Sequence, residues 1–65
     1  MKSPAFLQIY GEAMFVFGSA KLVANWLATP VEAFGNRAPQ DLVETEAGRT
    51  KIRARLRELD LDYKT

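Results

Sequence analysis

Two pairs of helix-ending residues limit the fold of this chain more than any other feature of its sequence. Gly18 is followed by Ser19, a good helix N-cap, and Pro30 disfavours the helical conformation for Thr29. A helix that approaches either pair must end there. The first 30 residues are therefore predicted to hold two helices joined by a tight connection.

Apolar residues before Gly18 recur at the spacing of one helical face. The first helix is predicted to begin at Pro4, which is tolerated at a helix start, and to end near Gly18. Leu7, Met14 and Phe15 fall outside this face, so the helix is apolar around more of its circumference than a one-sided surface helix needs. Either a second contact within the domain or a dimer or partner surface covers them. The side chains predicted to assist self-association or docking are Phe6, Leu7, Tyr10, Met14 and Phe15.

The second segment carries a clean amphipathic stripe, and its helix is predicted to run from the Ser19 cap to about Ala28. Trp26 lies in this stripe, where its large apolar area serves either as core filler or as an interface anchor, and the stripe favours the core. We expect Thr29 to cap a short turn that follows it. The stripe consists of Leu22, Val23, Trp26 and Leu27.

Beyond the short turn, Gly35 and Asn36 are the residue types most able to adopt a positive φ, which predicts a tight reversal. Residues 39–43 predict one short helical turn. The last helix is predicted to begin at Glu46 after a hydroxyl cap from Thr45, and to end at about Leu59. Its apolar stripe is Ile52, Leu56 and Leu59.

No strand pattern or internal repeat is visible, so the predicted fold is all-α, a small bundle of about three main helices plus a short helical turn. The 65 residues have room for one domain, residues 1–65. A domain this short is marginally stable, so dimerisation or a partner can supply part of its stability. The tail from Asp60 to Thr65 is expected to be mobile unless it docks.

The composition argues against an enzyme, because the chain contains no histidine and no cysteine. The eight acidic residues are scattered or lie beside basic ones, which favours a solvated surface over a catalytic pair. The four glycines are too far apart for a phosphate-binding loop. We therefore predict no catalytic residues, no cofactor and no metal.

Five basic residues fall within nine positions of the last helix, which raises the possibility of nucleic-acid binding. At about 100° per residue they lie on two flanks of the apolar stripe rather than on one face. We expect their methylenes to cover apolar surface; an acidic partner surface is the second interpretation, and nucleic acid is the weakest of the three. Arg55 and Glu58 form a possible i, i+3 pair. The five are Arg49, Lys51, Arg53, Arg55 and Arg57.

No apolar run approaches the roughly 18 residues that a membrane span needs, and the N-terminus lacks a signal-peptide layout. A cytoplasmic protein is the resulting prediction. Met1 and the absence of tag sequence suggest a complete reading frame, although an excised domain would look the same.

Several fixed spacings together resemble the toxin-binding domain at the C-terminal end of Xre/MbcA/ParS-type antitoxins. The residues that carry this resemblance are Trp26-Leu27-Ala28-Thr29-Pro30, Phe34-Gly35-Asn36-Arg37-Ala38-Pro39-Gln40-Asp41-Leu42-Val43 and Thr45-Glu46-Ala47-Gly48-Arg49. The flanking helices extend it to most of residues 5–63. Three positions depart from the family pattern: Val31 stands in place of an Asn, Asn36 in place of a second Gly, and Lys64 in place of a Gly.

The resemblance implies a helical inhibitor that covers the active-site entrance of a RES-domain, NAD-consuming toxin or of a related ADP-ribosylating toxin, often within a dimeric antitoxin. It also implies that tail residues reach toward the toxin's pocket. The familiar antitoxins carry a helix-turn-helix DNA reader before this domain, and we expect none here. The predicted partner contacts are Pro30, Phe34, Arg37, Arg53, Arg57, Leu61, Tyr63 and Lys64.

The leading hypothesis is a non-catalytic protein-binding module that neutralises a toxin by steric occlusion. The alternative is a stand-alone small inhibitor or adaptor of phage or mobile-element origin that acts on a non-toxin protein. The identity of the neighbouring reading frame separates the two.

Overall fold

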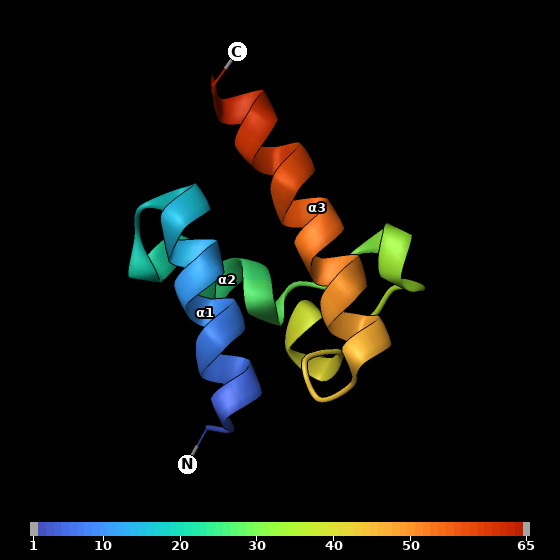
Figure 1. The fold of residues 1–65 in the computed structure, drawn as a ribbon. Coiled ribbons are helices and arrows are strands. Elements are labelled where there is room, and N and C mark those ends of the chain that lie inside the picture. Colours follow the sequence, from blue (N-terminus) through green and yellow to red (C-terminus); the bar gives the residue numbers. More distant parts are fainter. Residues whose placement is uncertain (1, 65) are drawn as a thin grey trace.

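The described residues form three helices and two short 3₁₀ turns (Figure 1). The structure, a computed structural model, describes residues 2–64, with side chains described to residue 62. The helices are α1 (Pro4–Phe17), α2 (Ala20–Ala28) and α3 (Glu46–Lys64), and the turns are η1 (Glu32–Phe34) and η2 (Pro39–Asp41). No β-strand occurs in the described range. The all-α prediction is confirmed.

The boundary between α1 and α2 follows from local chemistry. Ser3 caps the start of α1, because its hydroxyl accepts a hydrogen bond from the Phe6 amide at 3.1 Å. Gly18 ends α1 with a φ of 70° and donates its amide to the Met14 carbonyl at 2.7 Å. Ser19 then caps α2 by accepting from the Leu22 amide at 3.4 Å. The predicted ends of both helices are confirmed.

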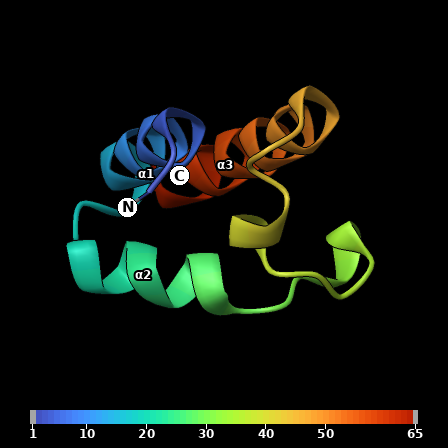
Figure 2. The same ribbon diagram turned by 90° about the horizontal axis from the view of Figure 1, so that it is seen from below.

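The helices form two layers. Helices α1 and α3 lie side by side in one layer, and α2 crosses beneath them in the other (Figure 2). Helix α1 contacts both α2 and α3, and η2 packs against α2 between the layers. The last turns of α3 extend past the ends of α1 and α2 (Figure 1).

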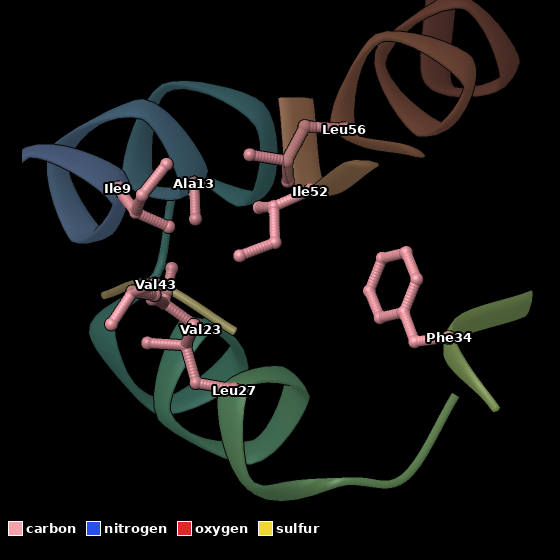
Figure 3. Packing of buried hydrophobic residues seen from close by; sticks show 8 residues of the cluster. All are labelled: Ile9, Ala13, Val23, Leu27, Phe34, Val43, Ile52 and Leu56. Carbon is pink, nitrogen blue, oxygen red and sulfur yellow. The ribbon is translucent and has the colours of Figure 1, made fainter. Parts of the chain in front are cut away.

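Side chains from all three helices and both loops fill the space between the layers. Figure 3 shows those of the helices and Val43 pointing toward a common centre, with Phe34 at the edge, on the loop side. Trp26 is half-buried at the border of this core, where its ring lies 5.7 Å from that of Phe17, centroid to centroid. The buried cluster is Ile9, Ala13, Val23, Leu27, Phe34, Val43, Ile52 and Leu56.

The loop after α2 closes on itself. The Val31 amide donates to the Arg37 carbonyl at 3.1 Å, and the Asn36 amide donates back to the Val31 carbonyl at 3.0 Å. Gly35 and Asn36 adopt φ values of 69° and 62°, which confirms the predicted reversal. The predicted role of Thr29 is wrong: its hydroxyl donates to the Asn25 carbonyl at 2.6 Å, because Thr29 ends α2 and is too far from η1 to cap it.

The start of α3 is packed closely against the turn before it. Thr45 caps the helix, as predicted, because its hydroxyl accepts from the Gly48 amide at 3.0 Å. A side chain at Gly48 would place its Cβ 2.0 Å from the Leu42 carbonyl oxygen, so only glycine fits there. Arg49 donates from Nη1 to the Val43 carbonyl at 2.7 Å.

The far end of α3 differs from the prediction. The helix continues to Lys64 rather than ending at about Leu59, so the backbone of residues 60–64 is helical and not a loose tail. No glycine or proline follows Gly48, and nothing in the sequence stops the helix once it has begun.

Candidate functional site

A groove between α1 and α3 is lined by both apolar and charged side chains. It runs toward the free end of α3. The lining residues are Glu12, Phe15, Val16, Arg53, Leu56, Arg57 and Asp60.

A two-pronged ion pair bridges this groove. Arg53 of α3 donates from Nε to Oε1 of Glu12 at 2.9 Å and from Nη2 to Oε2 at 3.0 Å. These hydrogen bonds raise the pKa of the Arg53 guanidinium above its usual value, although some desolvation opposes the shift. Both side chains are about two-fifths exposed, so solvent weakens the pair and its contribution to the stability of the fold is small.

Beyond the ion pair, the groove opens onto exposed apolar side chains. Phe15 is 80% exposed on α1 and Leu61 is 59% exposed on α3. Arg57 lines the groove beside Phe15 and lies one helical turn before Leu61, so the two α3 side chains project on the same side. Two large exposed apolar side chains near one arginine are typical of a protein-binding surface.

The predicted partner residues fall on two sides of α3. Pro30 and Arg37, both exposed, belong to the loop between α2 and η2, and the part of this loop around η1 lies on the side of α3 away from α1 (Figures 1 and 2). Phe34 is only 7% exposed and belongs to the core, so it holds this loop against α3 instead of offering a contact. The structure brings together Arg53 and Arg57 at the groove, with Leu61 farther along α3. The side chains of Tyr63 and Lys64 lie outside the described residues.

The residues predicted for self-association are divided as well. Phe6 and Tyr10 are half-buried with ring centroids 6.3 Å apart, and they line an apolar groove between α1 and α2. Met14 is also half-buried. Leu7, 58% exposed, and Phe15 point outward from α1. These exposed side chains are therefore the ones available to a second protein.

Most of the basic cluster is engaged within the domain. Arg49 donates to the Val43 carbonyl, Arg53 to Glu12, and Arg55 to Glu58 at 3.3 Å, the i, i+3 pair that the sequence predicts. Cations that hold internal acceptors on different sides of a helix do not form one phosphate-binding face. The arrangement therefore argues against the nucleic-acid interpretation, which was the weakest of the three.

The described residues hold no group of three or more carboxylates, histidines or cysteines that could bind a metal ion. Within the same range no helix combines the length and apolar character that a membrane crossing requires. All buried polar side-chain atoms described here have a hydrogen-bond partner.

Sequence reasoning missed two residues of this region. Glu12 is the only charged residue between Pro4 and Phe17, and that isolation in an apolar helix was the signal for a specific partner. Gly11 lies next to it in the middle of α1 on an open surface. Glycine is less favourable than alanine in a helix interior, so the presence of Gly11 in the middle of α1 was a signal that this position is not an ordinary helix position.

Comparison with known proteins gives two matches. The model of the family described as antitoxin Xre/MbcA/ParS C-terminal toxin-binding domain matches residues 12–60. A curated protein named antitoxin Xre, from Yersinia enterocolitica serotype O:8 / biotype 1B, is 35% identical over 48 residues. That alignment covers 72% of this chain but 32% of the relative, so the chain spans about a third of the relative's length. No solved structure matches.

Proposed function

Because this chain belongs to the family of antitoxin Xre/MbcA/ParS C-terminal toxin-binding domains, we propose that it is a non-catalytic inhibitor that binds a protein toxin and covers the entrance to its active site. We propose further that the toxin is of the RES type, which consumes NAD, or a related ADP-ribosylating enzyme. The mechanism is steric, and the domain contributes no reactive group.

One observation carries this proposal, namely the projecting end of α3. Its last turns extend past the other helices (Figure 1), and Leu61 is 59% exposed there. A single helix is only about 10 Å wide. It can therefore enter a narrow cleft that a flat protein surface cannot enter. An exposed leucine at such an end supplies the apolar anchor of a helix-in-groove contact.

Charge adds specificity to the same end. Arg57 lies one turn before Leu61, and acidic residues follow it at Glu58, Asp60 and Asp62. A toxin that accepts this end therefore needs an apolar pocket with carboxylates near Arg57 and cations near the acidic turn. Such patterning favours one partner over others more than it raises affinity. Tyr63 and Lys64 remain predicted contacts on the same helix.

The experiment is co-purification with the toxin of the neighbouring reading frame, followed by titration calorimetry and an assay of NAD consumption. Leu61→Ser and Arg57→Glu are each expected to weaken binding about tenfold or more and to restore NAD consumption. Leu22→Ser on α2, 47% exposed, is the matched control and leaves binding unchanged. No complex at micromolar concentrations, or equal effects of the three variants, would contradict the proposal. Binding to a neighbouring protein that is not a toxin would favour a small adaptor instead.

A further inference from the structure

A second groove lies between α1 and α2, and it shares no lining residue with the groove between α1 and α3. Its volume is about 390 Å³, within the range of about 300 to 1,000 Å³ that is usual for binding pockets. The residues that line it are Lys2, Phe6, Leu7, Tyr10, Ala24, Leu27 and Gln40.

The apolar walls of this groove reach from solvent to the core. Leu27 of α2 belongs to the buried cluster and is 2% exposed. Phe6 and Tyr10 of α1 are half-buried, while Leu7 and Ala24 are exposed. The groove is therefore an open apolar channel rather than an enclosed cavity.

The charge of this groove has one sign. Lys2 is the one charged residue among the described side chains that line it, and its Nζ lies 4.7 Å from the centre of the Phe6 ring. Such a cation–π contact holds the ammonium beside the apolar wall. The groove between α1 and α3, in contrast, is lined by two carboxylates and two arginines.

The two helices that form the walls supply no free carboxylate. The only acidic residue of α1 is Glu12, which Arg53 binds, and the only charged residue of α2 is Lys21. In the loop before α3, Glu44 accepts a hydrogen bond from the Ser3 hydroxyl at 2.5 Å and does not line the groove. An incoming carboxylate therefore meets cations beside this groove and little competition for them.

We infer that the groove between α1 and α2 binds an acidic amphipathic segment of a second partner protein, with its apolar side chains in the channel and a carboxylate beside Lys2. Small-molecule sites enclose most of their ligand, which a channel with exposed edges such as Leu7 does not do. An apolar channel between two helices instead suits the helix-in-groove mode of binding. The toxin contact proposed above uses the end of α3, so this site goes beyond that proposal and does not depend on it.

The charge of the segment is tested with three synthetic helical peptides that share one stripe of leucine and phenylalanine and carry Glu, Gln or Lys beside it. Titration calorimetry with the full chain is expected to show the tightest binding for the Glu peptide and the weakest for the Lys peptide. Lys2→Glu is expected to weaken binding of the Glu peptide about fivefold and to remove this order. Lys51→Glu is the matched control, because Lys51 is an exposed lysine of α3 that does not line the groove.

The place of binding is tested by filling the channel. Ala24→Trp is expected to weaken binding of the Glu peptide at least tenfold, while Ala47→Trp, at an exposed position of α3, leaves it unchanged. Circular dichroism shows whether both variants fold, and Leu7→Ser, which removes an exposed wall residue, is the second variant and should weaken binding as well. Leu61→Ser should leave binding of the peptide intact.

Four results would overturn the inference. The first is no binding of the Glu peptide at millimolar concentration, and the second is equal affinity for the three peptides. The third is tighter binding of dodecanoate than of the Glu peptide, which would make the groove a site for a small amphiphile. The fourth is loss of toxin affinity in a folded Ala24→Trp variant, which would assign this groove to the toxin. The proposed contact at the end of α3 is judged separately, by the Leu61→Ser and Arg57→Glu variants.

Discussion

Two glycines within helices, Gly48 at the start of α3 and Gly11 on the outer face of α1, have opposite surroundings. A Cβ at Gly48 would lie 2.0 Å from the Leu42 carbonyl oxygen, while a Cβ at Gly11 would meet open space among the described residues. The first lies next to the core, and the second lies between exposed apolar side chains. The same residue type therefore occupies a crowded position in one region and an open position in the other.

The two regions differ in how much they contribute to the stability of this small protein. The start of α3 is held to the turn before it through the Thr45 cap and the Arg49 contact with Val43. On the outer face of α1, Leu7 and Phe15 are 58% and 80% exposed, so this face contributes little to the packing of the fold. Substitutions at the start of α3 should therefore lower the free energy of unfolding, and substitutions on the outer face of α1 should lower it little.

The largest expected effect is at Ile52, next to the start of α3. Ile52 is fully buried, so Ile52→Ala leaves a cavity and is expected to destabilise the fold by about 3 kcal/mol. Urea unfolding followed by the fluorescence of Trp26 measures this change. Leu7→Ala on the α1 face is the matched control and should cost less than about 0.5 kcal/mol. Equal losses at the two positions would remove the distinction between the regions.

Gly48→Ala is expected to destabilise by about 2 kcal/mol, because the new methyl overlaps the Leu42 carbonyl and the start of α3 must shift. The same urea titration measures it. Ala47→Gly, at an exposed neighbouring position, is the control and should cost about 1 kcal/mol at most. A Gly48→Ala variant as stable as the wild type would mean that the turn before α3 can shift at little cost in free energy.

Gly11→Ala is expected to change the free energy of unfolding in the opposite direction from Gly48→Ala. It should stabilise the dilute monomer by about 1 kcal/mol, because alanine is the better helix former and nothing crowds the position. Thermal unfolding followed by circular dichroism at low concentration measures the gain. A loss of monomer stability here would mean that α1 packs against an unrecognised neighbour.

The smallest expected effect is at the Glu12–Arg53 pair, which links α1 to α3. Both side chains are about two-fifths exposed, so the coupling in a double-mutant cycle with Glu12→Gln and Arg53→Met should be below about 1 kcal/mol. The coupling should shrink further in high salt. A coupling well above this value would make the pair part of the core rather than of the groove.

The helix boundaries were largely predictable from the sequence, because they depend on neighbours a few residues apart. Ser3, Ser19 and Thr45 accept hydrogen bonds from amides three residues later, and Gly35 and Asn36 take the left-handed conformation. Thr29 was the exception among the caps, since its hydroxyl turned back to Asn25 within α2. The continuation of α3 to Lys64 was missed because the apolar stripe ends before the helix does.

The candidate site was less predictable. The sequence places Arg53 and Arg57 on one flank, but only the packing of α1 against α3 brings Glu12 to Arg53 and Phe15 to Arg57. The exposure of Phe34 could not be read from its neighbours either, because its burial depends on how the loop folds against α3.

The chain's own order of residues determined its three helices, their caps, its reversal at Gly35 and its family, since these follow from local conformational preferences and fixed spacings. Tertiary structure alone decided which apolar side chains stay exposed, which glycine lies at a crowded position and which at an open one, and where the end of α3 projects. These properties depend on contacts between segments that are distant in the sequence, and no local preference encodes such contacts.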